Sequence, residues 1–508
     1  MADRKVIVIG LDGATWDLIK PWANEGKLPA FKTLMDEGAY TELYSTLPPL
    51  SPAAWTSIFT GLKPTKHSIW SFVKQRRDSY SIRPISSRDV IGKSLWNILS
   101  ENGIRSIFIN IPFFYPPSKF DGIITTGLGT PSRNSDFSYP LNIKDKIVCK
   151  FPKYNVDFNE DKILRNKDKS FVIDSVYETT EAHINVYKHF YNREKDSAKV
   201  FSLVLRPLDV IQHYFWNDKE TLFKFYKQAD TFLNWCINNK EREDVLLVCS
   251  DHGFRGIEKK IYINEILKKE GFLNDRSSEK SIKEKIIPSL ESIHLLLIRL
   301  GMRNSIWRIK NSKYLTFLAK LFPSETFSYE NRINWKETKA FFLQASGGVI
   351  QINVDDRESQ GSVSRINYEK TREKLIDILI KFNDIQTGDN LFELVEKGEN
   401  IYGNLGKFPD IVLYPKNGYT VAGGFSNTGK ITEKEDERNG DHSLKGIFMV
   451  LGEPISNCKI RSKVNVWDIA AIVLNLMNIP TPINFDGRMK NEILKKSKFN
   501  PRKKDIIK

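Results

Sequence analysis

Cysteine is scarce in this chain of 508 residues, and the four that occur are scattered along it. They lack the short spacing of a thiolate metal site, and Cys249 falls inside an apolar run that we expect to be a strand. The spacing argues against a disulfide scaffold. We therefore expect buried thiols rather than disulfides. The four positions are Cys149, Cys236, Cys249 and Cys458.

Long apolar runs are also missing. No stretch of about 18 apolar residues occurs, so the sequence predicts no transmembrane segment. Met1–Lys5 leads directly into an apolar run without a signal-like segment, and we expect a cytoplasmic protein. Internal repeats and low-complexity segments are absent. A chain of this length can bury a substantial core and should contain more than one lobe.

Positive charge exceeds negative charge, with a formal net charge of +15. Basic residues concentrate after Arg488, where they could attract nucleic acid or an anionic membrane surface. Beyond Phe499 no aromatic residue interleaves with these charges, so a solvated tail is the favoured interpretation and no nucleic-acid partner is predicted. The clustered residues are Lys495, Lys496, Lys498, Arg502, Lys503 and Lys504.

Short apolar runs are present, and acidic or histidine side chains follow them. Such runs are typical of buried parallel strands, and open α/β sheets bind ligands at the carboxyl ends of their strands. The sequence therefore predicts an α/β fold with a polar site at one sheet edge. Asp12 follows the run Val6–Ile9, Asp209 follows Phe201–Leu205, and Asp251 and His252 follow Val245–Val248.

Together with a serine, these residues form a set that can bind two divalent cations. Three carboxylates, three neutral imidazoles and one serine alkoxide carry four negative charges, which match two M²⁺ ions. Asp209 and His213 are four residues apart and would share one face of a helix, and Gly253 permits a turn after His252. Mixed oxygen and nitrogen ligands favour zinc, although manganese or iron also fits. The seven residues are Asp12, Ser51, Asp209, His213, Asp251, His252 and His442.

Each of these signals has an ordinary structural interpretation when taken alone. Asp12 could cap a helix, and Asp209 with His213 could be a surface pair. Their conjunction around one serine instead points to phosphoryl-transfer chemistry.

The motifs that carry these residues resemble those of the alkaline phosphatase superfamily, in its type I phosphodiesterase/nucleotide pyrophosphatase-like branch of predicted phosphohydrolases and phosphomutases. The resemblance runs nearly from end to end. It comprises Gly10–Gly13, Pro49–Gly61 with Pro64 and His67, Asp209–His213 with Trp216, Ser250–Phe254, Asn353–Gly361, Pro409–Val412, Asp441–Phe448 and Asp486–Arg488.

The resemblance implies a three-layer α/β sandwich with a mostly parallel central sheet and a largely helical cap insertion. It also implies that Ser51 is the nucleophile of a reaction with a phosphoseryl intermediate. Pro52 can start a helix there and place free backbone N–H groups beside a phosphate. The implied ligands are Asp209, His213 and His442 for one metal, and Asp12, Asp251, His252 and Ser51 for the other.

Two departures from related families narrow the activity. Nucleotide pyrophosphatases usually place an asparagine shortly after the histidine segment, but none occurs from His67 to Phe72, so nucleotide specificity is not implied. Sulfatases need Pro and Arg at the second and fourth positions after the nucleophile, where this chain has Ala53 and Trp55. The sequence therefore argues against a sulfatase.

We divide the chain into a catalytic core in two parts, 1–255 and 341–487, a helical cap insertion at 256–340, and a basic tail at 488–508. Ser289–Ile298 and Tyr314–Leu321 show helical patterns within the cap. Gly348–Asn353 and Ile411–Tyr414 are expected to rejoin the central sheet.

The leading hypothesis is a metal-dependent phosphohydrolase, a phosphodiesterase or phosphatase, that acts on a small-molecule phosphate ester. A phosphotransferase or phosphomutase is the alternative within the superfamily, and a non-catalytic binding protein with the same fold is a third. Arg206 and Lys66 could contact substrate.

Overall fold

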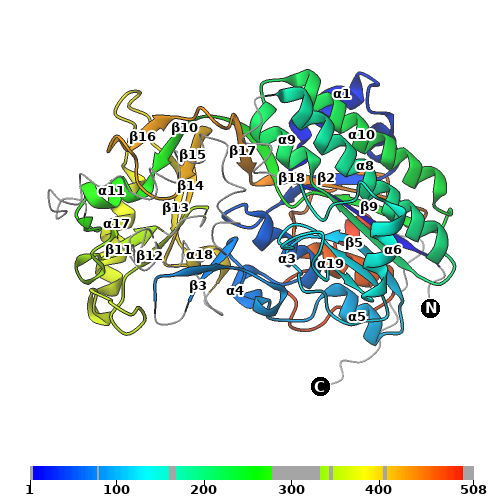
Figure 1. The fold of residues 1–508 in the computed structure, drawn as a ribbon, viewed down its shortest axis with the longest axis horizontal. Helices are drawn as coiled ribbons and strands as arrows, with labels where there is room; N and C mark the ends of the chain where they lie inside the picture. Colours follow the sequence, from blue (N-terminus) through cyan, green and yellow to red (C-terminus); the bar gives the residue numbers. More distant parts are fainter. Residues whose placement is uncertain are drawn as a thin grey trace, which may run out of the picture.

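A computed structural model describes residues 4–76, 79–158, 168–276, 332–342, 347–403 and 409–495. The chain forms a larger lobe around a broad sheet and a smaller lobe beside it (Figure 1). Strand β10 (Gly253–Tyr262) belongs to the smaller lobe and follows the larger lobe directly in the chain.

The larger lobe is built on a ten-stranded sheet in the order β19-β2-β18-β9-β1-β8-β5-β6-β7, with β20 also paired to β2. Its five central strands, from β9 to β6, are all parallel, whereas β18 is antiparallel to both β9 and β2. This arrangement confirms the predicted mostly parallel central sheet. The strands are β1 (Val6–Leu11), β2 (Ala39–Tyr44), β5 (Ser106–Ile111), β6 (Gly122–Thr126), β7 (Ser138–Tyr139), β8 (Val200–Leu205), β9 (Val245–Cys249), β18 (Lys445–Leu451), β19 (Cys458–Lys459) and β20 (Val464–Asn465).

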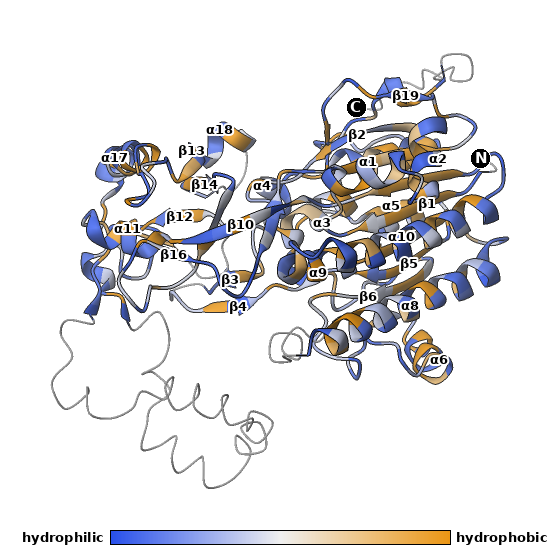
Figure 2. Cartoon of the chain, turned by 90° about the horizontal axis from the view of Figure 1, so that it is seen from above, coloured by the Kyte–Doolittle hydropathy of each residue, from blue (hydrophilic) through white to orange (hydrophobic). Residues whose placement is uncertain are grey.

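Helices cover both faces of this sheet and make the predicted three layers (Figure 1). Because side chains alternate along a strand, Ile7 and Ile9 of β1 pack into one buried cluster, and Val6 and Val8 pack into the other. In Figure 2, β1 and β5 are mostly hydrophobic, whereas α8 and α10 show both colours. One layer contains α1 (Trp16–Asn24), α2 (Pro29–Glu37), α6 (Asn142–Lys150), α8 (Lys169–Glu194), α9 (Pro207–Phe215) and α10 (Lys219–Asn239); the other contains α3 (Ser51–Thr60), α5 (Leu95–Glu101) and α19 (Asp468–Leu476).

The smaller lobe contains two four-stranded sheets. One has the order β15-β10-β16, with β17 also paired to β10, and the other has the order β11-β12-β14-β13. A third buried cluster of apolar side chains lies in this lobe. Its elements are β11 (Ala340–Phe342), β12 (Val349–Ile352), β13 (Phe392–Lys397), β14 (Ile411–Pro415), β15 (Gly418–Ala422), β16 (Thr432–Lys434), β17 (Gly440–Ser443), α11 (Ile263–Lys269), α17 (Tyr368–Ile380) and α18 (Gly398–Tyr402).

The expectation that residues 348–353 and 411–414 rejoin the central sheet is wrong. These segments form β12 and β14, which pair antiparallel with each other in the smaller lobe. An apolar run shows that a strand is buried but does not reveal its partner. Of the second half of the chain, β18, β19 and β20 return to the main sheet.

The helical patterns expected at 289–298 and 314–321 lie outside the described residues. The described parts of the predicted cap insertion contain most of β10, α11, η4 (Trp335–Glu337) and the start of β11. The division at 255 and 340 therefore stays a prediction. The remaining short elements are α4 (Pro64–His67), β3 (Val73–Gln75), β4 (Ile82–Pro84), η1 (Ser87–Asp89), η5 (Arg365–Asn367) and η6 (Asn491–Ile493).

All four cysteines are free thiols, as predicted, but only Cys236 and Cys249 are buried. Cys149 is exposed, which corrects the expectation that these thiols are buried. Within the described ranges, no helix has both the length and the apolar character needed to cross a membrane.

Candidate active site

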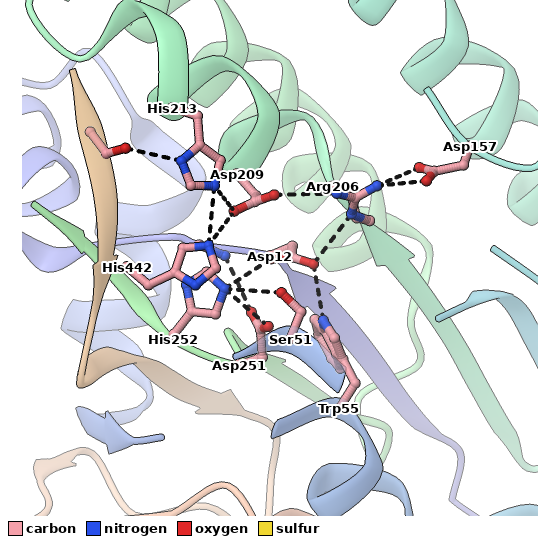
Figure 3. Close-up of polar contacts among 12 residues, drawn as sticks. Asp12, Ser51, Trp55, Asp157, Arg206, Asp209, His213, Asp251, His252 and His442 are labelled. Atoms are coloured by element: carbon pink, nitrogen blue, oxygen red, sulfur yellow. Dashed lines mark hydrogen bonds and ion pairs between the residues drawn. The ribbon is translucent and has the colours of Figure 1, made fainter. Parts of the chain in front are cut away.

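The fold brings all seven predicted site residues to the carboxyl edge of the main sheet (Figure 3). Asp12 directly follows β1, and Asp209 lies in the first turn of α9 after β8. Asp251 and His252 connect β9 to β10. Ser51 is the first residue of α3, and His442 lies on β17. Residues distant in sequence thus converge because parallel strands end at one edge.

One cluster contains Asp209, His213 and His442. His213 and His442 place their Nε2 atoms 3.3 Å and 3.1 Å from Asp209 Oδ1. The two Nε2 atoms lie 3.1 Å from each other. The spacing of four residues on α9 therefore places Asp209 and His213 together, as the sequence predicts. Asp441, which sequence reasoning did not select, also offers an oxygen within 4.8 Å of both histidines.

A second cluster contains Asp12, Asp251 and His252. The His252 Nε2 atom lies 3.5 Å from Asp12 Oδ1 and 3.3 Å from Asp251 Oδ2. The Gly13 N–H donates to Asp251 Oδ1 at 3.3 Å. Gly253 is required here for space rather than for a left-handed turn, because a Cβ atom would lie 2.0 Å from the Lys445 carbonyl oxygen.

Two buried oxygens in the second cluster accept no hydrogen bond from any described residue: Asp12 Oδ1 and Asp251 Oδ2. Leaving a buried carboxylate oxygen without a partner is costly, and most such atoms in native proteins have one. The residues present therefore fit a bound cation, which would supply the missing interaction.

The three histidines share one orientation of the ring. The Nδ1 atom of His213 lies 3.0 Å from the Gly440 carbonyl oxygen. The Nδ1 atom of His442 lies 2.8 Å from the Pro49 carbonyl oxygen, and that of His252 lies 3.0 Å from the Gly253 carbonyl oxygen. A carbonyl can only accept, so Nδ1 carries the proton that each ring donates. In the neutral rings every Nε2 atom then presents a lone pair to the centre of the site. Metal-binding histidines are held in this way.

Burial and mutual repulsion perturb the carboxylates. Burial, and next the Asp209 carboxylate, raises the pKa of Asp251 to about 7. The pKa of Asp12 is also raised well above its usual value, first by burial and then by Asp251 and Asp209. Burial acts upward on the pKa of Asp209 too, but contacts with His213 and His442 outweigh it and hold that pKa well below normal. Divalent cations would favour ionisation of the whole group.

Ser51 lies beside the second cluster. Its hydroxyl is 3.2 Å from His252 Nε2, and because that nitrogen carries the lone pair, the hydroxyl donates. As predicted, Pro52 lies in the first turn of the helix that begins here. The unpaired N–H groups and positive dipole end of α3 therefore face the region around Ser51.

Trp55 was selected in the sequence only as evidence against a sulfatase, but it contacts the site. Its indole Nε1–H donates to Asp12 Oδ2 at 3.0 Å, and the side chain is fully buried. The ring packs against Gly10, where a Cβ atom would lie 2.4 Å from the ring. Trp55 sits one turn after Ser51 on the same helix, which is the only sequence signal that could have indicated this contact.

Arg206 lies beside the two clusters and contacts one carboxylate of each (Figure 3). Its guanidinium contacts Asp209 at 3.3 Å and Asp12 at 3.6 Å, and donates twice to Asp157 at 2.6 and 2.8 Å. It also lines the cavity that contains Ser51. Lys66, the other candidate for substrate contact, instead pairs with Asp486 at 2.8 Å.

A cavity of about 860 Å³ opens over the site. Four of the seven site residues line it: Ser51, Asp209, His213 and His442. Residues from both lobes complete its walls, including Arg133, Phe158, Arg255, Phe342, Tyr414 and Thr420. The space is much larger than a phosphoryl group and matches the size of small-molecule sites in general.

Solved structures share this fold at low sequence identity. Phosphonoacetate hydrolase from Sinorhizobium meliloti 1021, in complex with phosphonoformate, has a TM-score of 0.57 and 13% identity, covering 93% of this chain and 95% of that one. Human ectonucleotide pyrophosphatase / phosphodiesterase 5 has a TM-score of 0.51 and 12% identity, covering 95% and 97%. These likenesses confirm the predicted fold class.

No curated protein sequence matches the chain significantly. The sequence signature described as Type I phosphodiesterase / nucleotide pyrophosphatase, however, matches residues 6–445. The match spans β1 through the start of β18, and so includes every residue of both clusters. The chain therefore belongs to the type I phosphodiesterase / nucleotide pyrophosphatase family, and its predicted class, a phosphoric ester hydrolase of the alkaline phosphatase superfamily, is confirmed.

Proposed function

We propose that this protein is a metal-dependent phosphohydrolase that uses Ser51 as its nucleophile and two divalent ions. Its substrates would be phosphodiesters or phosphomonoesters of small molecules. The observation that carries this proposal is the meeting of two clusters of inward-facing ligand atoms at one serine hydroxyl.

The contacts suggest which residues hold each ion. Asp209, His213 and His442 would bind one, since their ligand atoms lie within 3.3 Å of one another. Asp12, Asp251, His252 and the Ser51 oxygen would bind the other, which would satisfy the two buried oxygens that lack hydrogen bonds. Three carboxylates and a serine alkoxide balance the charge of two M²⁺ ions. Mixed oxygen and nitrogen ligands favour zinc, with manganese as the alternative.

The reaction begins at the Ser51 oxygen. When bound, the ions would lower the pKa of its hydroxyl and neutralise charge on the phosphoryl oxygens. Ser51 loses its hydroxyl proton to solvent and forms a bond to phosphorus while the ester P–O bond breaks. The alkoxide leaves with the bonding electrons and takes up a proton to become the free alcohol. A water molecule then loses a proton and attacks the phosphoserine, the bond between phosphorus and the Ser51 oxygen breaks, and the serine oxygen regains a proton.

Two features of the chain would orient this chemistry. The N-terminus of α3 presents backbone N–H groups and a positive dipole end beside Ser51, where an anionic phosphoryl group would lie. Arg206 contacts one carboxylate from each cluster and would fix the positions of these two carboxylates relative to each other. Its two hydrogen bonds to Asp157 fix the guanidinium in this place.

Turnover of bis-p-nitrophenyl phosphate and p-nitrophenyl phosphate by the metal-loaded protein tests the proposal. Ser51→Ala should abolish turnover but retain the fold and most bound metal, because Ser51 is one of four ligands to its ion. Ser197→Ala, at an exposed serine, is the matched control and should behave as wild type. Turnover at the wild-type rate by Ser51→Ala would overturn the mechanism.

A further inference from the structure

The cavity over Ser51 is lined by an arginine, Arg255, that pairs with no carboxylate of the described residues. Arg255 lies on β10 and is only 9% exposed. It donates to the Pro415 carbonyl at 2.8 Å and to Asn417 Oδ1 at 2.9 Å, and its guanidinium lies 4.5 Å from the centre of the Tyr414 ring. These contacts hold the side chain but are all with neutral groups.

No carboxylate of the described residues forms an ion pair with Arg255. Asp441 is its partner in the register of β10 and β17, but the Asp441 carboxylate accepts a hydrogen bond from Thr420 instead. The Arg255 Nε atom is buried and has no hydrogen-bond partner in the part of the chain that the structure describes. A buried, unpaired cation is costly, so an anionic partner from outside the chain would explain why it is retained.

Other buried arginines in the described part of the chain show the usual arrangement. Arg206 contacts three carboxylates, and Arg372 pairs with Glu369 and Glu399. Arg255 differs from both because it combines burial, a cavity position and the lack of a counter-ion among described residues.

A second arginine lines the same cavity from the larger lobe. Arg133 lies in the segment between β6 and β7 and donates to the Val148 carbonyl at 3.4 Å. Among the described residues its buried Nε atom has no hydrogen-bond partner, and no carboxylate forms an ion pair with its guanidinium. Each lobe thus contributes to the cavity one arginine that forms no ion pair with a carboxylate of the described residues.

We propose that the natural substrate carries a second anionic group, a carboxylate or a further phosphate, which binds Arg255 and Arg133 while the reacting phosphoryl group lies at Ser51. This inference rests on the proposed function, because it assumes that the phosphate ester binds at Ser51. Arg255 and Arg133 would then determine specificity rather than take part in bond breaking. Two guanidinium groups suit a planar carboxylate and a tetrahedral phosphate equally, since each of these anions can accept paired hydrogen bonds from a guanidinium.

Competitive inhibition of bis-p-nitrophenyl phosphate turnover provides the test. Alkyl phosphates of increasing chain length are compared with ω-carboxyalkyl phosphates and with alkanediol bisphosphates of equal length. For at least one length, an anionic end should improve inhibition about tenfold or more over the neutral end, the effect of a buried charge-assisted hydrogen bond. The carboxylate and bisphosphate series show which anion the site prefers.

Arg255→Gln and Arg133→Gln should each reduce this preference for an anionic end severalfold. The preference is measured as the inhibition constant of the neutral-ended phosphate divided by that of the anionic-ended phosphate of equal length. Arg255→Lys, which keeps the charge, should retain part of it even if Arg255→Gln fails to fold. Arg461→Gln, at an exposed arginine, is the control and should leave the ratio unchanged.

Equal inhibition by neutral and anionic ends at every length would overturn the inference. An unchanged ratio in both Arg133→Gln and Arg255→Gln would also overturn it, as would an unchanged ratio in Arg133→Gln alone if Arg255→Gln fails to fold. Such a result leaves the proposed function intact if wild type still hydrolyses bis-p-nitrophenyl phosphate and Ser51→Ala does not. Turnover that survives in Ser51→Ala would instead mark a failure of the proposed function.

Discussion

Trp55→Phe should weaken metal binding although Trp55 is not a ligand. The substitution keeps an aromatic ring beside Gly10 but removes the N–H that donates to Asp12 Oδ2 at 3.0 Å. Arg206, whose Nε lies 3.6 Å from that oxygen, would remain as an ion-pair partner. Asp12 would lose the contact that fixes its carboxylate plane.

The size of the effect follows from this geometry. A hydrogen bond to a buried carboxylate contributes about 1.5–3 kcal/mol. Removing a partner that orients a metal ligand typically lowers metal affinity by about 10–100-fold. This loss equals about 1.4–2.8 kcal/mol, so the two estimates agree. We therefore expect a loss of this size at the ion nearest Asp12, and little change at the other.

Trp96→Phe is the matched control. Trp96 is also buried, at 1% exposure, and its Nε1–H donates to Ser118 Oγ at 2.9 Å, but it contacts neither cluster. Both variants should lose similar packing and one hydrogen bond. Titration against a chromophoric chelator compares their metal affinities, and melting with and without metal separates binding from stability. Equal metal affinities in the two variants would refute the role of Trp55.

Three further predictions concern metal content, acid stability and packing. Asp209→Ala and Asp251→Ala should each lower the metal content of the purified protein from two ions toward one, and elemental analysis that finds two ions in both would contradict the ligand assignment. Burial lowers the pKa of His183 to about 4, so the folded state favours the neutral ring and stability falls as pH drops from about 6.5 toward 4. Near pH 5 the loss of stability is about 2 kcal/mol. Urea unfolding with chelator present should therefore show that His183→Gln loses less stability than wild type between about pH 7 and 5. The same dependence of unfolding free energy on pH in both proteins would contradict this. Gly10→Ala should destabilise the protein by about 1–3 kcal/mol because its Cβ atom would lie 2.4 Å from the Trp55 ring; unchanged urea unfolding would contradict it.

The sequence predicts the carboxylates of the site well because their positions follow from strand periodicity. Asp12, Asp209 and Asp251 each come shortly after a buried parallel strand, and such strand ends must meet at one edge. His213 was predicted from its spacing of four residues after Asp209, whereas Ser51 and His442 follow no such local pattern and depend on the motifs of a known superfamily. The structure adds that the ligand atoms face inward.

Other features depend on contacts that no local pattern encodes. Arg206 and Arg255 are single basic residues near motifs, and only the structure shows that the first has three carboxylate partners whereas the second has none among the described residues. The partners of β12 and β14 were predicted wrongly because burial of a strand is local but its pairing is not. The cytoplasmic location and the role of the basic tail rest on sequence alone.

Trapping the covalent intermediate tests the central claim most directly. Metal-loaded protein would be mixed with p-nitrophenyl phosphate, quenched in acid during turnover, digested and mapped by mass spectrometry. We predict a phosphoryl group on Ser51, absent from Ser51→Ala. Continued turnover with no phosphoryl group on Ser51, or with the group on another residue, would contradict the serine mechanism.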